Sequence, residues 1–323
     1  MTSLPRVAQR VLPFAALFGL AIGPSVTSAQ ARARAYDGGR QVLDLDGTLV
    51  STKSVEGGGT FADVVLESVA GGMQKKHIAG VKFDDFTIQV SPAMPKLLAD
   101  WVTNAWNRNY TRKNGAVVET DFNDKELVRH NFKNAVIAET TIPTLDAGSR
   151  SPGFITITVA PEIVQEAKGT SAVRTAAPAP ATKAFLVSNF SLDIGGLGGK
   201  ISKIDSFTVK QKMNVATVGE EKMQQREAGT TVYPNLVVTM SETGDDKWVA
   251  WFQDFLIKGN NGEALEKSGK LTLLGPDMKT VLATITLYNV GIYGFEPVAL
   301  ESGTVRRMQA KLYVERMEIS PAP

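Results

Sequence analysis

The sequence predicts a mainly β protein made of two tandem antiparallel β-sandwich or barrel domains, each with one flanking α-helix. Two observations lead to this fold class. Short segments in the first half of the chain recur in the same order about 150 residues later. Both halves also contain alternating apolar residues interrupted by one stretch with helical periodicity.

The recurring segments define a diverged tandem repeat. They are Leu43-Asp44-Leu45-Asp46-Gly47 with Leu192-Asp193-Ile194-Gly195-Gly196, Lys53 with Lys203, Ser91 with Ser241, Trp101 with Trp251, and Phe132-Lys133-Asn134-Ala135 with Leu287-Tyr288-Asn289-Val290. Duplicated modules commonly pack side by side or stack into continuous surfaces. The repeat therefore favours a role in assembly over one in catalysis.

Strands and one helix are predicted in each half. Residues 154–159, 236–240 and 284–288 alternate or run with β-branched side chains, and turn residues between such runs favour antiparallel hairpins. The apolar positions at helical spacing are Leu97, Leu98, Trp101, Val102, Ala105 and Trp106 in the first half, and Trp248, Val249, Phe252, Phe255 and Leu256 in the second. We expect one face of each helix to pack on its sheet. Ser91 and Ser241 stand ahead of these helices, where a hydroxyl can cap the first amides.

The amino terminus has the pattern of a signal peptide. Arg6 and Arg10 begin it, and the apolar run over residues 11–23 is too short to span a bilayer. The candidate cleavage sites follow Ala29, Ala31 and Ala33. We expect an extracytoplasmic protein, periplasmic or secreted, with no stable membrane insertion after cleavage. A retained membrane anchor is the alternative.

Composition divides the rest of the chain into two domains and a linker. The predicted parts are a signal peptide at 1–29, a first domain at 36–165, a linker at 166–184 and a second domain at 185–323. The linker contains Ala176-Ala177-Pro178-Ala179-Pro180-Ala181, which favours an extended, semi-rigid spacer. An ordered loop packed on either domain is the alternative.

Charge and cysteine content exclude some classes of protein. The chain has 35 basic and 33 acidic residues, so losing Arg6 and Arg10 with the signal peptide leaves 33 of each and no net charge. Lysines are scattered instead of clustered, and we expect no nucleic-acid partner. There is no cysteine, so the fold must depend on buried apolar area instead of disulfides.

One motif resembles an enzyme signature. Asp44-Leu45-Asp46-Gly47-Thr48-Leu49-Val50 matches the first motif of the haloacid dehalogenase superfamily of phosphatases. There the first aspartate is the nucleophile, and the second is the general acid and base beside a magnesium ion. Few apolar residues precede the motif here, no strand and helix alternation follows it, and the second copy has Gly195 where Asp46 would stand. A hairpin with Asp46-Gly47 at its turn is favoured, and a phosphatase using Asp44 and Asp46 is the remote alternative.

No other pattern predicts catalysis, a cofactor or a metal. The glycine-rich run from Gly195 to Lys200 lacks the glycine that a phosphate loop needs at Ile194, and we interpret it as a hairpin tip. His77 and His130 are the only histidines, and neither has the spacing of a zinc ligand. We assign no catalytic, cofactor-binding or metal-binding residue, and we expect a protein that is not an enzyme.

The order of parts resembles the phage tail tube proteins of contractile-tailed phages and related phage-tail-like injection systems. In the first copy the order is a strand at 42–46, the segment at 53–58, a strand at 86–90, the Trp101 helix, Phe132-Lys133-Asn134-Ala135, Ile142-Pro143-Thr144-Leu145-Asp146 and a final strand. The second copy repeats this order with Trp251, Tyr288-Asn289-Val290 and Glu296-Pro297. The resemblance covers most of the mature chain. It implies β-sandwiches that join side by side into a ring with a β-lined lumen, and rings that stack into a tube.

What the resemblance implies about function is a structural, self-assembling protein, a homo-oligomer of rings or stacked rings. Other tube or baseplate-like components are further candidate partners. The chain departs from the family in carrying an export signal and two domains. A duplicated subunit would close a ring with half as many chains, for instance as a pseudo-sixfold trimer. An extracytoplasmic β-sandwich binding module that no longer forms tubes is the alternative function.

Overall fold

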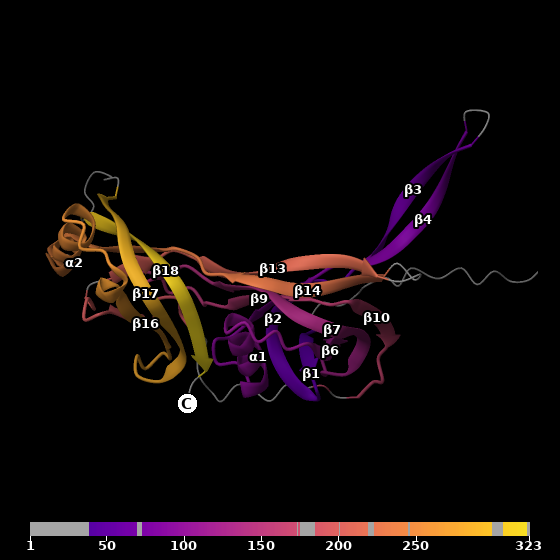
Figure 1. Ribbon diagram of the computed structural model, residues 1–323. Helices are drawn as coiled ribbons and strands as arrows, with labels where there is room; N and C mark the ends of the chain where they lie inside the picture. Colours follow the sequence, from indigo (N-terminus) through magenta and orange to yellow (C-terminus); the bar gives the residue numbers. More distant parts are fainter. Residues whose placement is uncertain are drawn as a thin grey trace, which may run out of the picture. The chain divides into compact units, whose positions relative to one another are not determined.

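The computed structural model describes residues 39–69, 73–172, 174, 185–199, 201–218, 223–244, 246–298 and 306–321. The chain from Asp37 onward forms one compact unit (Figure 1). The predicted signal peptide at 1–29 lies outside the described residues. As predicted, the fold is mainly β and antiparallel, with two helices of seven or more residues, one in each half of the described chain.

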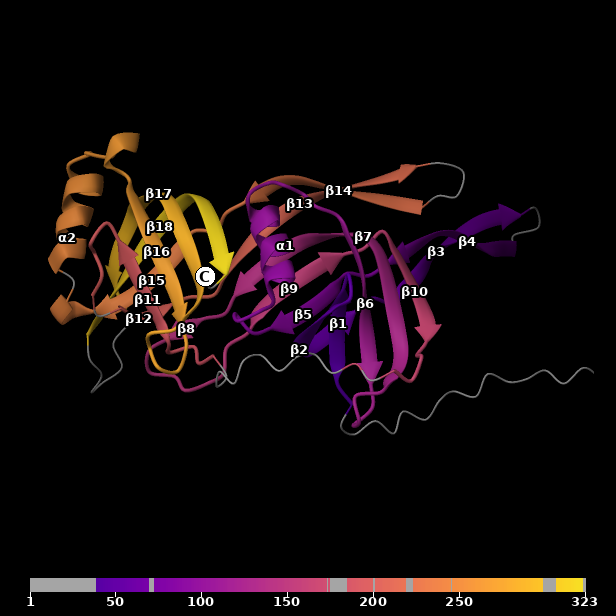
Figure 2. The same ribbon diagram turned by 90° about the horizontal axis from the view of Figure 1, so that it is seen from below.

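Six strands of the first half pair in a closed circuit. In circuit order they are β1 (Gln41–Leu45), β2 (Thr48–Gly57), β5 (Phe86–Val90), β9 (Ile155–Ala160), β7 (Glu126–Ile142) and β6 (Lys113–Thr120), which returns to β1. Every pair is antiparallel. The first half is therefore a small barrel that has no unpaired gap around its circumference (Figure 2).

The long strand β7 takes part in more pairings than the circuit requires. Its first part lies between β6 and β10 (Ile163–Lys168), and its second part pairs with β9. A register shift between Ile137 and Glu139 lies within the second part. Bulges of this kind bend a strand and re-aim its edge. The edge of this second part that faces away from β9 is thereby open to a further strand.

The second half forms an open sheet. Its order is β11 (Phe190–Ile194), β16 (Lys267–Leu274), β17 (Val281–Pro297), β18 (Arg307–Pro321), β15 (Leu236–Ser241), β12 (Ile201–Ile204) and β8 (Leu145–Asp146). In the part of the chain that is described, β11 and β12 do not pair with each other. The prediction of a hairpin tip between them is wrong, because Gly198-Gly199 stand where Leu49-Val50 begin β2, and glycine is a poor strand residue.

Pairing registers in the second half repeat those of the first. Asp44 of β1 lies opposite Ala116 of β6, and Asp193 of β11 lies opposite Lys270 of β16. β6 and β16 are each followed by the longest strand of their half, β7 or β17. Asp46 and Gly195 both have positive φ, as do the glycines that follow them. The expected match of Lys53 with Lys203 is shifted by one. Ser54 holds the register position of Lys203, since both strands carry a bulge just before it.

A second shared feature is an asparagine at a bulge. Asn134 and Asn289 have φ of 51° and 52°. The Nδ2 of Asn134 donates to Glu162 over 2.9 Å, and the Nδ2 of Asn289 donates to Glu315 over 2.8 Å. Asparagine tolerates the left-handed region better than most residues, and here its side chain also bonds across the strands.

The helices are α1 (Lys96–Trp106) and α2 (Asp246–Phe252), and α2 continues into a π-helical turn at Gln253–Ile257. Short 3₁₀ turns lie at Glu242–Gly244 and Glu263–Leu265. Trp101, Trp106 and Trp248 are fully buried, as the helical spacing predicted. The expected cap by Ser91 is wrong, and the residue before α2 lies outside the described part, so the cap by Ser241 stays a prediction. Pro95 precedes α1, and Ser91 instead accepts a bond from the amide of Ala93, because three residues separate it from the cap position.

Each half also contains a long hairpin, which lies between β2 and β5 in the first half and between β12 and β15 in the second. These are β3 (Thr60–Val69) with β4 (Met73–Phe83), and β13 (Phe207–Val218) with β14 (Met223–Val232). The second hairpin joins the sheet of the first half, since β13 pairs with β7. In the described chain the strands of the first hairpin pair with each other alone. The two halves thus exchange strands, and strand pairing joins them in addition to the chain connection.

The start of the predicted linker is ordered. β10 continues to Lys168, past the expected boundary at residue 165. Beyond it, Arg174 Nε donates to Glu126 over 2.8 Å, and Thr170 Oγ1 donates to the same carboxylate over 3.3 Å. Glu126 is buried, and paired cations and hydroxyls stabilise such a charge. Residues 175–184 lie outside the described part, so the spacer character of the alanine and proline run stays a prediction.

The left-handed asparagines generate a stability prediction. Asn289→Ala removes the bond to Glu315 and places a Cβ-bearing residue without a local bond in the left-handed region, which costs about 1–2 kcal/mol. Asn289→Gly relieves the backbone cost and is the matched control, with a smaller loss. Urea unfolding monitored by tryptophan fluorescence measures both. Equal losses for alanine and glycine would show that the backbone conformation contributes nothing.

Candidate assembly surface

The seam between the halves begins with strand addition. Residues Phe207 to Lys210 of β13 lie antiparallel to Ile142 to Glu139 of β7. Thr141 and Thr208 bond through their hydroxyls at 2.8 Å, and Lys210 Nζ donates to Glu139 over 2.9 Å. Main-chain hydrogen bonds satisfy the edge of β7, while side chains fix the register.

Bonds to the carboxyl-terminal end of α1 hold the hairpin further along. Gln211 Nε2 donates to the carbonyl oxygen of Ala105 over 2.8 Å, and Tyr233 Oη donates to that of Trp106 over 2.7 Å. Tyr110 Oη donates in turn to the carbonyl oxygen of Gly229. The Ala105 carbonyl oxygen also accepts from the amide of Arg108 at 3.2 Å. Carbonyls in the last turn of a helix lack the usual helical partner, and Gln211 and Tyr233 add donors to two of them.

An ionic cluster completes the seam. Arg226 of β14 pairs with Asp85 and donates to the carbonyl oxygen of Phe83 over 2.6 Å. Arg112 pairs with Glu162 and donates to the carbonyl oxygen of Arg226 over 2.7 Å. Burial raises the pKa of Asp85, while the Arg226 charge opposes this shift. The cluster lies at the base of the β3–β4 hairpin, which it connects to the second half.

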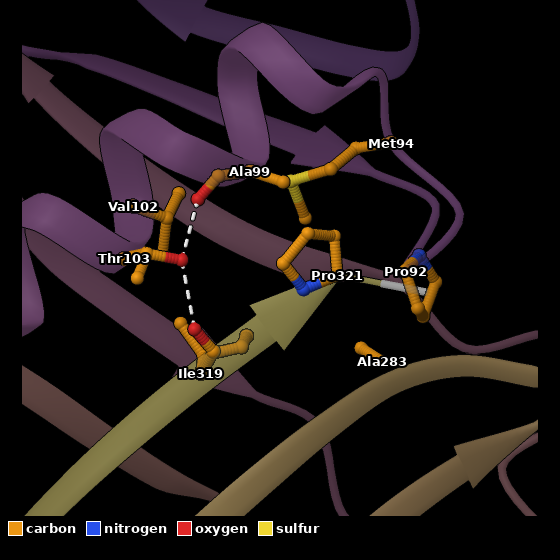
Figure 3. A pocket seen from close by; sticks show the side chains of 8 residues that line it. All are labelled: Pro92, Met94, Ala99, Val102, Thr103, Ala283, Ile319 and Pro321. Atoms are coloured by element: carbon orange, nitrogen blue, oxygen red, sulfur yellow. Dashed lines mark hydrogen bonds between the residues drawn. The ribbon is translucent and has the colours of Figure 1, made fainter. Parts of the chain in front are cut away.

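The helix of the first half also contacts the second half. Thr103 Oγ1 lies 2.7 Å from the carbonyl oxygen of Ile319 and 2.9 Å from that of Ala99, so one hydroxyl bridges α1 and β18 (Figure 3). Beside it is a small apolar hollow lined by Pro92, Met94, Ala99, Val102, Thr103, Ala283, Ile319 and Pro321. With one hydroxyl among apolar groups, this hollow offers little to orient a polar ligand, and it is best described as a packing seam.

Among the described residues, the β3–β4 hairpin lacks the strand partner that its counterpart has. Six of its large apolar side chains are exposed; they are Phe61, Val64, Val65, Leu66, Ile78 and Val81. Ile78 is 76% exposed. Cross-strand pairs of Lys82 with Asp63 and His77 with Glu67 link the two strands. The hairpin extends away from the barrel in Figure 1, and its apolar residues form a candidate assembly surface.

The phosphatase-like motif lies on an antiparallel hairpin. Asp46 and Gly47 form its two-residue turn, with φ of 48° and 82°, as the sequence favoured. Asp44 accepts a bond from the amide of Gly47 at 3.0 Å and pairs with Arg129 at 2.6 Å. Both acids thus have structural roles. In the phosphatase chemistry the nucleophile ends a parallel strand, and β1 is antiparallel to both neighbours.

The other predicted site features also lie apart. His77 is on β4, and His130 is on β7, 3.6 Å from Glu119. Within the described ranges, no group of three or more histidine, cysteine, aspartate or glutamate side chains could hold a metal ion. No helix in those ranges is long and apolar enough to cross a membrane. Lys200, the last residue of the glycine-rich run, lies outside the described residues.

Comparisons with known proteins show low similarity. No protein-family model matches the chain, and no curated protein matches it. Among solved structures, a chain of the sheath–tube complex of an extracellular contractile injection system, PVC, in its extended state matches at 12% identity and a TM-score of 0.35, over 41% of this chain and 88% of that one. The tube-terminating cap of the anti-feeding prophage matches at 15% and 0.36, over 42% and 89%.

Hcp1 from Flavobacterium johnsoniae matches at 12% identity and a TM-score of 0.28, over 41% of this chain and 95% of that one. All three TM-scores are low.

Sequence reasoning did not find the role of the two hairpins. A usable signal was present: the run Val64-Val65-Leu66 and the glycines at 57–59 predict a strand that starts at a flexible point and is apolar on both faces. The sequence could not predict that β13–β14 pairs with a strand of the first half while β3–β4, among the described residues, does not.

The geometry of Asp44 gives a prediction that separates structure from catalysis. Asp44→Asn removes the charge beside Arg129, whose neighbour Glu126 is itself buried, and should lower the free energy of unfolding by about 2 kcal/mol. Asp46→Asn, at the exposed turn, is the control and should change stability little. Thermal unfolding measures both. A magnesium-dependent phosphatase activity lost in both variants, with stability unchanged, would contradict the structural role.

Proposed function

We propose that this chain is an exported structural protein that assembles with copies of itself into rings or stacked rings. The observation that carries the proposal is the different state of two equivalent hairpins. β13–β14 adds to the edge of β7 within the chain, whereas β3–β4 has no such edge to join among the described residues. A neighbouring copy offers that edge.

Physical reasons make the β3–β4 hairpin weakly stable when it has no partner. An isolated two-stranded hairpin is marginally stable in water. Full burial of a large aliphatic side chain stabilises by about 1.5–3 kcal/mol, and six large apolar residues of this hairpin are exposed. Unpaired strand edges with apolar side chains readily pair with another chain. Assembly would stabilise the hairpin and remove the exposed apolar surface together.

The internal seam also supports a tandem duplication and a closed assembly. If the halves descend from one ancestral subunit, the contact between them reproduces a former contact between separate subunits. The same contact would then connect the second half of one chain to the first half of the next. Head-to-tail contacts of this kind close into rings when the rotation permits. A pseudo-sixfold trimer is the simplest closure for a two-domain subunit.

The other functions considered have weaker support. The binding-module alternative requires a polar concave site, and the hollow beside α1 is small and almost wholly apolar. The phosphatase alternative requires Asp44 to be free for attack, and its carboxylate is held by Arg129 and the Gly47 amide. We therefore propose a role without catalysis.

Export is the second component of the proposal, supported by the basic and apolar pattern of residues 1–29. We expect the protein in the periplasmic or extracellular fraction, with a mass that corresponds to cleavage after Ala29, Ala31 or Ala33. Fractionation with intact-mass spectrometry measures this. Full-length protein retained in the cytoplasm would contradict it.

Assembly should depend on the exposed face of the hairpin. Ile78→Asp places a charge on this surface and should reduce the assembled fraction by at least tenfold, since burying an unpaired charge costs more than about 1.4 kcal/mol. Phe122→Asp is the matched control, because Phe122 is 79% exposed on a turn far along the chain from the hairpin. Light scattering over a concentration series, negative-stain microscopy and native mass spectrometry give the assembled fraction and the ring size. Monomers at every concentration would favour a binding module, and a pentamer would exclude the trimer.

A further inference from the structure

A stretch of β17 in the second half corresponds to the edge of β7 that β13 covers. Asn134 and Asn289 both have positive φ, and a register shift follows each of them, skipping Ala138 in β7 and Tyr293 in β17. With these positions aligned, residues 294–297 of β17 correspond to residues 139–142 of β7, with which β13 pairs. In the described chain no strand pairs with residues 294–297 on the side away from β18.

The two long hairpins can be matched by their pairing registers. Ser54 and Lys203 hold equivalent register positions. Counting on equally from each places Phe61 of β3 at the position of Lys210 of β13. The bulges agree with this match, because each hairpin pairing is interrupted after the next residue. Phe61 is therefore the counterpart of the residue that pairs with Glu139 within the chain.

This ion pair has no charged counterpart on either surface. Lys210 Nζ donates to Glu139 over 2.9 Å, and the equivalent residues are Phe61 on the hairpin and Gly294 on β17. A change on one surface alone would leave a charge beside an apolar group, which is costly. Phe61 is 56% exposed, and an aromatic ring packs well across a strand pair from a glycine. The two replacements are thus complementary to each other.

An apolar contact beside the ion pair is matched in the same way. Met213 of β13 packs against a small cluster in the first half, formed by Val136, Ala138 and Ala160. The same registers place Val64 at the position of Met213 and Tyr293 at the position of Ala138. Val64 is 62% exposed and Tyr293 is 44% exposed, whereas Ala138 is buried. Both members of the equivalent contact are therefore apolar and exposed.

Burial along the two edges differs accordingly. Thr140 and Ile142 of β7 are fully buried. Their counterparts on β17 are Phe295, which is half-buried, and Pro297, which is exposed. Because proline has no amide to donate, the ladder that can form on β17 has three residue pairs, at residues 294–296.

The contact of the hairpin with the helix also changes from polar to apolar. Gln211 donates to the carbonyl oxygen of Ala105 at the end of α1, and its counterpart on β3 is Ala62. At the corresponding end of the second helix, in the π-helical turn after α2, Leu256 and Ile257 are exposed. Apolar surface thus occupies both sides of the equivalent contact.

We propose that residues 294–296 of β17 in one chain receive residues 59–61 of β3 from a second copy, with Phe61 opposite Gly294 and Val64 against Tyr293. The inference rests on the proposed self-assembly and specifies both surfaces of the contact and its register. The partner is a second copy because the complementary replacements lie on β3 and β17 of this same chain. The second half of each chain then binds the first half of the next, head to tail.

The replaced ion pair also prevents the two contacts from exchanging partners. Phe61 opposite Glu139 would leave a carboxylate without its lysine, and Lys210 opposite Gly294 would leave a lysine without its carboxylate. Unpaired charges of this kind discriminate against the wrong partner. Each hairpin therefore fits one of the two edges.

Transplanting the ion pair tests the register. Phe61→Lys and Gly294→Glu should each lower the assembled fraction of the full chain about tenfold, because each places a lone charge in the contact. The double variant re-creates the Lys210–Glu139 pair and should assemble more strongly than either single variant. Phe61→Lys combined with Gly294→Lys is the matched control and should not recover. Sedimentation velocity measures assembly, and thermal unfolding checks that each variant is folded.

A disulfide tests the same register covalently. The chain has no cysteine, so Gly59→Cys and Glu296→Cys each introduce a single thiol. These positions correspond to Thr208 and Thr141, whose hydroxyl oxygens lie 2.8 Å apart. Opposite residues of an antiparallel pair have Cα atoms about 4.5–5.5 Å apart, within the range of a disulfide. Oxidation of an equal mixture of the two variants should give a covalent dimer, and neither variant alone should do so.

The outcomes separate this inference from the proposed function. Absence of assembly by the wild-type chain overturns both. Wild-type assembly without the mixed disulfide, or with a double charge variant no stronger than the single variants, overturns the contact between β3 and β17 and leaves self-assembly standing. The mixed disulfide together with recovery in the double variant supports the contact.

Discussion

The structure depends on one constraint, which is that the edge of a β-strand must find a partner for its main-chain groups. The first half meets it by closing its sheet, and the second half does not close. Its sheet includes β8 of the first half at one edge, paired with β12, and its own strand β13 pairs with β7 of the first half. Each side of the seam therefore satisfies the edges of the other, and the two halves become one compact unit.

The difference between the halves comes from few residues. Two glycines, Gly198 and Gly199, stand where β2 has Leu49 and Val50, and the strand pair that would close the second sheet is absent from the described chain. β8 instead pairs with Lys203 and Ile204 of β12. A small change in strand propensity thus determines which surfaces bond within the chain and which remain for other partners.

Much of the fold could be predicted from the sequence. The alternating strands, the helix at Trp101, the turn at Asp46-Gly47 and the recurrence of Asn134 as Asn289 are local or periodic signals, and the structure contains them. The exchange of strands between the halves could not be predicted, because an edge pairing joins residues far apart in sequence and leaves no local pattern. For the same reason the sequence did not reveal the Arg226 cluster.

The open side of the second sheet has a consequence for the order of folding. The closed sheet of the first half draws all its circuit strands from residues before 161, so it can form as soon as that part of the chain has emerged. The second half needs β8 and the edge of β7 as a template on which to complete itself. A chain that emerges from its amino terminus offers the finished template first, and misfolding would then concentrate in the later half.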